Sequence, residues 1–139
     1  MHPRKALRLV AALLGVTLLS CEAAPIVHFF NNSGYGVGVL ILDQEHAAPA
    51  SGEIEFDYPY AANGGISIRH GQCVLTYMPP SPPWDFMKGG ITRGHLRAQL
   101  EPDWRIFVVR SGEAFPAAAR SDDQPDGFPL VPRRSGACD

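Results

Sequence analysis

Hydrophobic and polar residues alternate with a period of two in much of the chain after residue 25. The alternation is clearest in EIEFDY, where Ile54, Phe56 and Tyr58 are separated by acidic residues. Successive side chains of a strand point to opposite faces, so this pattern predicts strands with one buried face. Other segments share the alternation or are rich in β-branched and aromatic residues: 26–32, 37–42, 66–70, 73–77, 95–100 and 104–110.

Residues that favour turns separate these segments. Asn32-Ser33-Gly34 predicts a hairpin between the first two strands, and His70-Gly71-Gln72 and Glu101-Pro102-Asp103 predict two further hairpins. No segment has the 3.6-residue hydrophobic period of an amphipathic helix. The sequence therefore predicts a mainly β fold, a single small antiparallel sandwich or barrel of about seven strands.

Two proline-rich stretches interrupt the alternation. Residues 78–93 include PPSPP, a composition that an interior strand does not tolerate, so we expect an extended loop that carries Trp84 and Phe86. Residues 111–139 contain four more prolines. We expect this C-terminal segment to lie across the sheet as an ordered strap, held by its apolar side chains and by Cys138.

The first residues have the composition of a secretory leader. Basic residues at positions 4, 5 and 8 precede an apolar run over residues 9–19, and this part of the chain has no acidic residue. The run is shorter than the ~20 apolar residues that span a bilayer. A basic start followed by a short apolar run predicts a signal peptide over residues 1–20.

The end of this leader, Leu18-Leu19-Ser20-Cys21, resembles the lipobox of bacterial lipoproteins. The resemblance implies that Cys21 receives a diacylglycerol, that the leader is cut before Cys21, and that the new amine is acylated. Two or three acyl chains anchor a protein stably, since each buried methylene contributes about 0.8 kcal/mol. Residues 21–25 would then form an acylated linker to a β domain over residues 26–139. The alternatives are conventional cleavage after Ala23 and an incidental thiol at Cys21.

The lipobox also implies a location and a membrane partner. In lipoproteins of the enteric type, an aspartate after the cysteine retains the protein at the inner membrane, whereas this chain has Glu22. We therefore expect a lipid anchor in the bacterial cell envelope, at the periplasmic face of the outer membrane. The lipid on Cys21 is the only non-protein group that we expect, and no other cofactor is predicted.

The net charge and the number of free cysteines are best considered for the chain that remains after cleavage of the leader. The leader holds three of the 12 basic residues and none of the 14 acidic ones, which leaves a net charge of −5. This excess of acidic groups argues against a nucleic-acid partner. With Cys21 acylated, Cys73 and Cys138 remain as a pair. In an oxidising envelope we expect them to form a disulfide, because their spacing does not match a metal site.

The proline-rich loop is the predicted surface for a protein partner, with Trp84, Phe86, Pro82 and Pro83 as the contact residues. A stiff segment loses little conformational entropy when it docks, and tryptophan is favoured at the centre of interfaces. The alternative is that Trp84 and Phe86 fold back and cap one end of the sandwich, since exposed aromatic side chains lower solubility.

The sequence contains no signature of catalysis. It has no Gly-x-Ser-x-Gly elbow, and the glycines of SGYGVG precede no helix that would complete a phosphate loop. The histidines at positions 28, 46, 70 and 95 lack metal-ligand spacing, although ligands brought together by folding alone leave no trace in a sequence. Asn31-Asn32-Ser33 matches a glycosylation sequon, a match that a bacterial leader makes accidental. We expect neither catalytic residues nor a metal, and hence no enzyme.

The function that we expect is that of a membrane-anchored envelope lipoprotein that binds another envelope protein, as a scaffold or assembly accessory. One alternative is a periplasmic binder of small ligands or cell-wall glycans that uses Tyr58, Tyr60, Tyr77 or Trp104 as stacking platforms. Another is an inhibitor of a host lytic enzyme such as a lysozyme, which rests on analogy alone.

Overall fold

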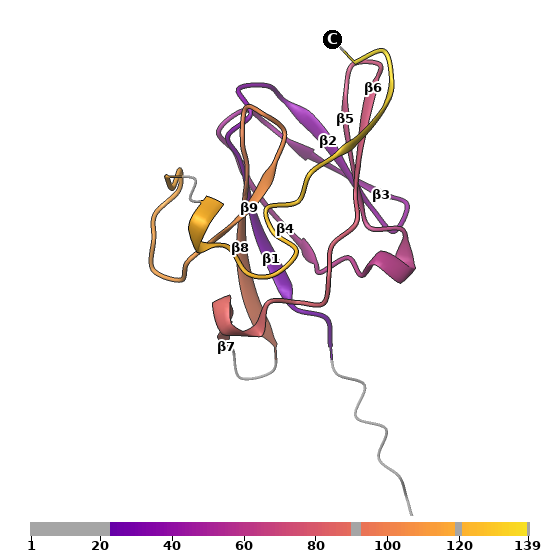
Figure 1. Ribbon diagram of the computed structural model, residues 1–139. Coiled ribbons are helices and arrows are strands. Elements are labelled where there is room, and N and C mark those ends of the chain that lie inside the picture. The colour runs from indigo at the N-terminus through magenta and orange to yellow at the C-terminus, as the bar shows by residue number, and fades with distance from the viewer. Residues whose placement is uncertain (1–22, 90–92, 119–120, 139) are drawn as a thin grey trace, which may run out of the picture.

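Two β-sheets of five strands each pack face to face in the computed structural model, which describes residues 23–89, 93–118 and 121–138 (Figure 1). The β1 sheet contains β4 (Glu53–Asp57), β1 (Ile26–Asn31), β8 (Gly94–Leu100) and β7 (Lys88–Gly89) in that order, with β9 (Ile106–Val109) also paired to β8. The β2 sheet has the order β10 (Arg133–Gly136), β6 (Cys73–Tyr77), β5 (Ile66–His70), β2 (Val37–Ile41) and β3 (Gln44–Ala48). The predicted mainly β fold is confirmed, and it is a sandwich whose sheets do not close into a barrel.

Helical structure among the described residues is limited to three single 3₁₀ turns, η1 (Ala61–Asn63), η2 (Trp84–Phe86) and η3 (Ser121–Asp123). The strands run between two ends of the sandwich (Figure 1). At the end called here the N-terminal end, β1 begins and η2 lies beside β7. At the opposite, distal end lie the β5–β6 turn, the β8–β9 turn and the last described residues of the chain.

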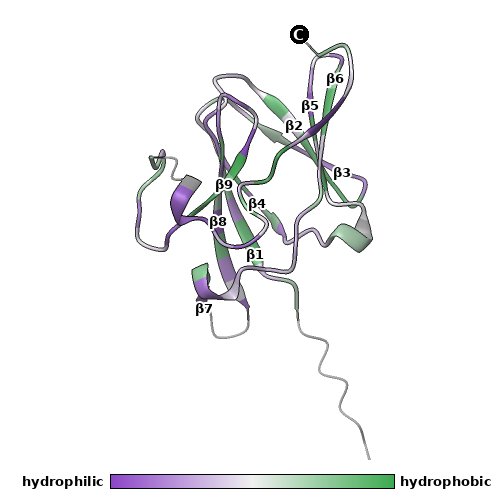
Figure 2. Cartoon of the chain, in the orientation of Figure 1, coloured by the Kyte–Doolittle hydropathy of each residue, from purple (hydrophilic) through white to green (hydrophobic). Residues whose placement is uncertain are grey.

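The core is formed by the alternating residues that face inward from both sheets, and hydrophobic positions recur along the strands in Figure 2. The inward residues of the predicted strands include Phe29, Phe56, Leu96, Ala98 and Leu100 in the β1 sheet and Val39, Ile66, Ile68, Leu75 and Tyr77 in the β2 sheet. Burying an aliphatic or aromatic side chain of this size contributes about 1.5–3 kcal/mol, so the two inner faces supply the main driving force for folding.

Two of the three predicted hairpins are present. Strands β5 and β6 pair antiparallel with Ile68 opposite Leu75, and β8 and β9 pair antiparallel with Ala98 opposite Val108. The hairpin predicted at Asn32-Ser33-Gly34 is wrong, because β1 and β2 belong to different sheets. The turn residues instead carry the chain from one sheet to the other.

Strand β2 forms its hairpin with β3, a strand that the sequence pattern did not predict. The two residues between them, Leu42 and Asp43, have φ angles of 47° and 63°. Positive φ at both central residues is what a type I′ hairpin turn requires, and it normally selects asparagine or glycine. The polar sequence QEHAA also has little intrinsic preference for a strand, so neither local signal was available.

Strands β1 and β8 pair in parallel, with Val27 opposite Leu96 and Phe29 opposite Ala98. The other strand pairs of the described residues are antiparallel, so the predicted antiparallel sandwich contains this one parallel pair. A parallel pair needs a long connection, and β2 to β7 lie between these two strands in the chain. Such a distant pairing has no local sequence signal.

Asn31, which is fully buried at the end of β1, fixes the crossing between the sheets. Its Nδ2 lies 2.6–3.1 Å from the carbonyl oxygens of Tyr35, Ala48 and Pro49, and its Oδ1 accepts hydrogen bonds from the Ser33 amide and hydroxyl at 3.1 and 2.6 Å. One side chain thus holds the β1–β2 crossing against the β3–β4 connection. The same burial leaves no room for a glycan on this asparagine.

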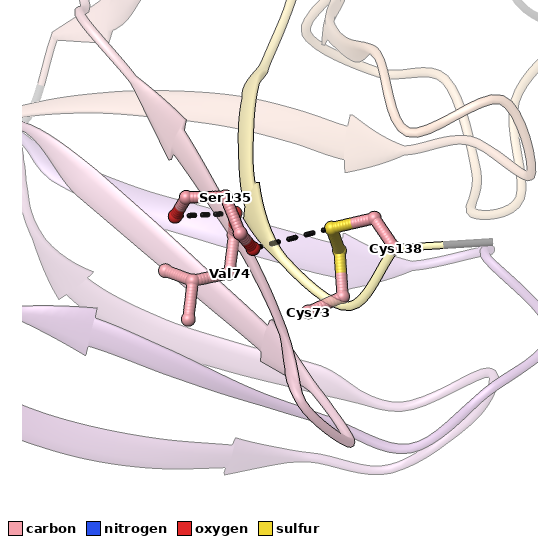
Figure 3. The surroundings of a disulfide bond; sticks show 4 residues. All are labelled: Cys73, Val74, Ser135 and Cys138. Carbon is pink, nitrogen blue, oxygen red and sulfur yellow. Dashed lines mark hydrogen bonds between the residues drawn. A yellow bond between two sulfur atoms is a disulfide. The ribbon is translucent and has the colours of Figure 1, made fainter.

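The C-terminal segment is an ordered strap that touches both sheets. Leu130 and Ile106 exchange two backbone hydrogen bonds of 2.8 and 3.0 Å beside β9, and β10 then adds to β6. The predicted pairing of Cys73 with Cys138 is found, with Cα atoms 4.7 Å apart (Figure 3). The bridge secures the segment that follows β10 to the start of β6.

The strap also covers part of the outer face of the β1 sheet. The Gln99 side chain exchanges two 2.8 Å hydrogen bonds with the backbone of Ala117, and Gln124 pairs in the same way with Val108 at 2.7 and 2.9 Å. Gln124 thereby satisfies the backbone of β9, which would otherwise present an unpaired strand edge. Phe107 of β9 lies outside the core cluster and is nevertheless buried.

We expect removal of the disulfide to lower the free energy of unfolding by about 2–4 kcal/mol, because the bridge closes a long loop in the unfolded chain. Its cysteines are 65 residues apart. Urea unfolding with and without reductant measures this difference. The double variant C73A/C138A should have the midpoint of the reduced protein and should not respond to reductant. Equal midpoints for oxidised and reduced wild-type protein would contradict the expectation.

We expect Asn31→Ala to lower the free energy of unfolding by about 2–3 kcal/mol, because it removes buried hydrogen bonds and leaves polar partners unsatisfied. Asn32→Ala is the matched control. Asn32 is only partly buried and donates one 3.1 Å hydrogen bond to Glu101, so its loss should cost less than about 1 kcal/mol. Urea denaturation of both variants checks the order, and equal losses would show that Asn31 does not hold the crossing.

Candidate functional site

The predicted partner-binding residues do not form one exposed surface. Pro82 is buried, Pro83 and Phe86 are half-buried, and Trp84 is 56% exposed. Phe86 packs against the core, and the Arg110 guanidinium lies 4.8 Å from the centre of its ring. Phe86 thus caps the sandwich as the alternative interpretation had it, whereas the ring of Trp84 faces solvent.

Trp84 lies at the edge of an open cavity of about 480 Å³ between the proline-rich loop and the strap. Its walls are residues 81–86 and 124–126, and we call it the proline groove. Each wall is ordered by contacts of its own: Trp84–Phe86 forms a 3₁₀ turn, and the Gln124 side chain is hydrogen-bonded to the backbone of Val108. The exposed residues Asp85 and Asp126 make its rim acidic.

The two walls of the groove are held together by close packing and by an ion pair. Gly127 has a φ of 82°, and a Cβ at this position would lie 2.8 Å from Cγ of Pro80, so only glycine fits. Arg110 binds Asp123 through two contacts, Nε–Oδ2 at 2.8 Å and Nη2–Oδ1 at 2.5 Å. The hydrogen bonds that the Arg110 guanidinium donates to Asp123 raise its pKa further above the ordinary value.

The tyrosines proposed as stacking platforms are largely hidden. Tyr58 and Tyr77 are buried, and burial raises the pKa of both phenols. Each hydroxyl donates a 2.7 Å hydrogen bond to a backbone carbonyl, that of Pro80 for Tyr58 and that of Trp104 for Tyr77. Both are therefore structural residues, and their proposed role as platforms is wrong. Tyr60 is more exposed, but its ring packs edge-on against Tyr58 at 5.6 Å.

Trp104 does belong to an aromatic cluster, with partners that the sequence analysis did not identify. Tyr35 and His70 lie 6.1 and 5.5 Å from the Trp104 ring, centre to centre, and 4.6 Å from each other. The three residues come from the β1–β2 crossing, the end of β5 and the β8–β9 connection. No sequence spacing predicts such a cluster.

This cluster borders an open cavity of about 470 Å³ at the distal end. Arg134 of β10 and the Cys73–Cys138 disulfide also line it. We call it the aromatic hollow, defined by Tyr35, His70, Trp104 and Arg134. It depends on the strap, because β10 and the disulfide provide one of its walls.

His28 and His95 form a polar chain on the outer side of the β1 sheet, whereas His46 lies in β3 with its ring near Phe56. Nε2 of His28 lies 3.0 Å from Nδ1 of His95, and Nδ1 of His28 lies 2.9 Å from Oε1 of Glu55. Within the described part of the chain, no group of three or more His, Cys, Asp or Glu side chains is arranged to hold a metal ion. Asp122 and Asp123 lie in η3, and Asp123 is bound by Arg110.

The chain is fixed to the sandwich from Ala24 onward. Arg93 donates hydrogen bonds of 2.8 and 2.5 Å to the Ala24 carbonyl and pairs with Asp57 at 2.6 Å. Pro25 is fully buried, and its carbonyl accepts a 2.7 Å hydrogen bond from the Tyr58 amide. The last two residues of the expected linker thus belong to the folded domain. Cys21 and the leader lie outside the described residues, among which no helix is long and apolar enough to span a bilayer.

Two open cavities are therefore candidate binding sites, the proline groove near the N-terminal end and the aromatic hollow at the distal end. Each presents an exposed aromatic ring on a rigid frame, as binding sites commonly do. The chain matches no protein-family model, no curated protein and no solved structure.

Proposed function

We propose that this protein is a lipid-anchored binding protein of the bacterial cell envelope that holds a segment of another envelope protein in its proline groove. The observation that carries the proposal is Trp84, a large aromatic side chain that is 56% exposed at the edge of a rigid cavity. Tryptophan is enriched among the residues that contribute most to protein interfaces, and here its exposed ring borders a preformed cavity. The proposal concerns binding and includes no chemical reaction.

The lining of the groove indicates the chemistry of the partner. Prolines and Trp84 form apolar walls for an extended peptide, and neither wall needs to be ordered on binding because both are already rigid. Asp85 and Asp126 at the rim would attract basic side chains that flank the apolar ones. The groove is thus suited to an extended segment with apolar residues and a lysine or arginine.

The short tether supports a partner that is close to the membrane. With a lipid on Cys21, three Cα–Cα steps separate the anchor from Ala24, a distance of at most ~11 Å. Ala24 is bound to the domain by Arg93, and η2 lies at the same end of the sandwich (Figure 1). The proline groove would therefore lie near the bilayer surface, where it can reach the membrane-proximal segment of another anchored protein.

We expect the mature protein to begin at Cys21 and to carry acyl chains. Intact-mass spectrometry of protein extracted from membranes should show the mass of residues 21–139 plus a diacylglycerol and one further acyl chain. Cys21→Ala should remove the added mass and the tight membrane association. This variant keeps its leader, because cleavage at the lipobox requires Cys21. Its melting temperature should otherwise equal that of the wild type. An unmodified polypeptide that begins at Ala24 would contradict the anchor.

We expect Trp84→Ala to weaken partner capture at least tenfold, because tryptophans at the centre of interfaces contribute about 2 kcal/mol or more. Cross-linking in intact cells, followed by isolation of the tagged protein, measures capture. The melting temperature should hardly change, because the side chain is exposed.

Val131→Ala is the matched control for this experiment. Val131 is 70% exposed on the strap and does not line the proline groove, so its removal should leave capture unchanged. Equal capture by both variants would contradict the role of Trp84. A parallel fall of stability and capture in the Trp84 variant would make Trp84 a structural residue.

A further inference from the structure

We infer that the aromatic hollow is a binding site for a saccharide that carries a carboxylate. This site is separate from the proline groove, and the inference does not depend on the proposed function. It rests on an exposed aromatic ring and a guanidinium that line the same cavity, and on the backbone contacts that hold the rings in place.

The platform is the Tyr35 ring, which is 54% exposed although it packs on two other rings. Tyr35 and Trp104 are nearly parallel, at 14°, and His70 contacts both. Their separation of 6.1 Å leaves no space for a ligand between them, so a ligand would stack on the outer face of Tyr35. The electron-rich face of an aromatic ring suits the C–H groups on one side of a pyranose ring.

Arg134 gives the hollow its preference for an anion. Its side chain is exposed on β10, and it has no carboxylate partner among the residues that the structure describes. The neighbouring Asp103 does not neutralise it, since Asp103 pairs with Arg105 at 2.6 Å. A guanidinium binds a carboxylate with two parallel hydrogen bonds, so Arg134 would select an acidic sugar over a neutral one.

The frame keeps the rings in place before any ligand arrives. Trp104 has a φ of 67°, which is unfavourable for a residue other than glycine. It is held there by the hydrogen bond from Tyr77 to its carbonyl and by its own amide, which donates to Glu101 at 2.9 Å. The Tyr35 carbonyl is bound by buried Asn31. A site that is already ordered loses little entropy on binding.

The size and lining of the hollow also favour a small polar ligand. Its volume of about 470 Å³ lies within the range of small-molecule sites, ~300–1,000 Å³. Its walls combine aromatic faces with an imidazole and a guanidinium, so sugar hydroxyls find donors and acceptors beside the platform. A purely apolar ligand would leave these groups without partners.

Two sugars that differ by one carboxylate provide the test. N-Acetylmuramic acid is N-acetylglucosamine with an added lactyl ether that carries the acid. The full chain, purified in mild detergent with Trp84→Phe, leaves Trp104 as the only tryptophan, so its fluorescence reports the hollow. We expect N-acetylmuramic acid to change this fluorescence saturably and to bind at least fivefold more tightly than N-acetylglucosamine.

Three variants assign the binding to named side chains. Arg134→Gln should reduce the preference for the acidic sugar to less than twofold, and Tyr35→Leu should weaken binding of both sugars at least tenfold. Both side chains are exposed, and unchanged melting temperatures would show that the folds are intact. Trp84→Ala should leave sugar binding unchanged, which separates failure of this site from failure of the proline groove.

Several results would overturn the inference. Equal affinity for the two sugars would contradict the preference for an acidic saccharide. Unchanged binding in the Tyr35 variant would contradict the role of Tyr35 as the stacking platform. The same response to acetate would mean a simple carboxylate site, and tighter binding of adenosine monophosphate would mean a nucleotide site. Saturation transfer from aromatic protons to sugar protons, measured by NMR, provides a readout independent of fluorescence.

Discussion

The buried amide of Asn31 is the interaction on which the arrangement of the two sheets depends. Strand β1 lies in one sheet and β2 in the other, and the crossing between them is bound to the β3–β4 connection through this side chain. An amide supplies donors and acceptors together, so a single residue can satisfy backbone groups of two loops. The Tyr35 carbonyl is among its partners, so the same interaction orients the aromatic hollow.

The sequence predicted those parts of the fold that local patterns encode. Alternation identified the inner faces of β4, β5, β6 and β8. The turn residues correctly predicted the β5–β6 and β8–β9 hairpins. Strand β3 was missed because its composition is polar and its turn residues, Leu42 and Asp43, are not those that type I′ turns favour. The parallel pairing of β1 with β8 and the crossing at Asn31 depend on residues far apart in the chain, which no local pattern shows.

The candidate sites were predicted only in part, for a related reason. Composition alone identified the proline-rich loop and Trp84, but the opposite wall of the groove comes from residues 124–126 of the strap. The aromatic hollow was not predicted, because Tyr35 and His70 meet Trp104 only after three loops converge. Strand β10, whose residues are all exposed, has no hydrophobic pattern and forms where β6 offers a free edge. Both cavities therefore exist only when the strap is in place.

The contact between Arg93 and Ala24 has a consequence for how far this protein can act. A domain on a long flexible linker explores a wide volume around its anchor. If Cys21 carries the proposed lipid, this domain has a short linker and can only reorient close to the membrane surface. The distance from the membrane within which the domain binds would then be about the size of the domain itself. With Cys21 acylated as we propose, partners of the groove would approach along the plane of the membrane, and ligands of the aromatic hollow would approach from the aqueous side. One anchored domain would thus present two cavities to molecules that arrive from different directions.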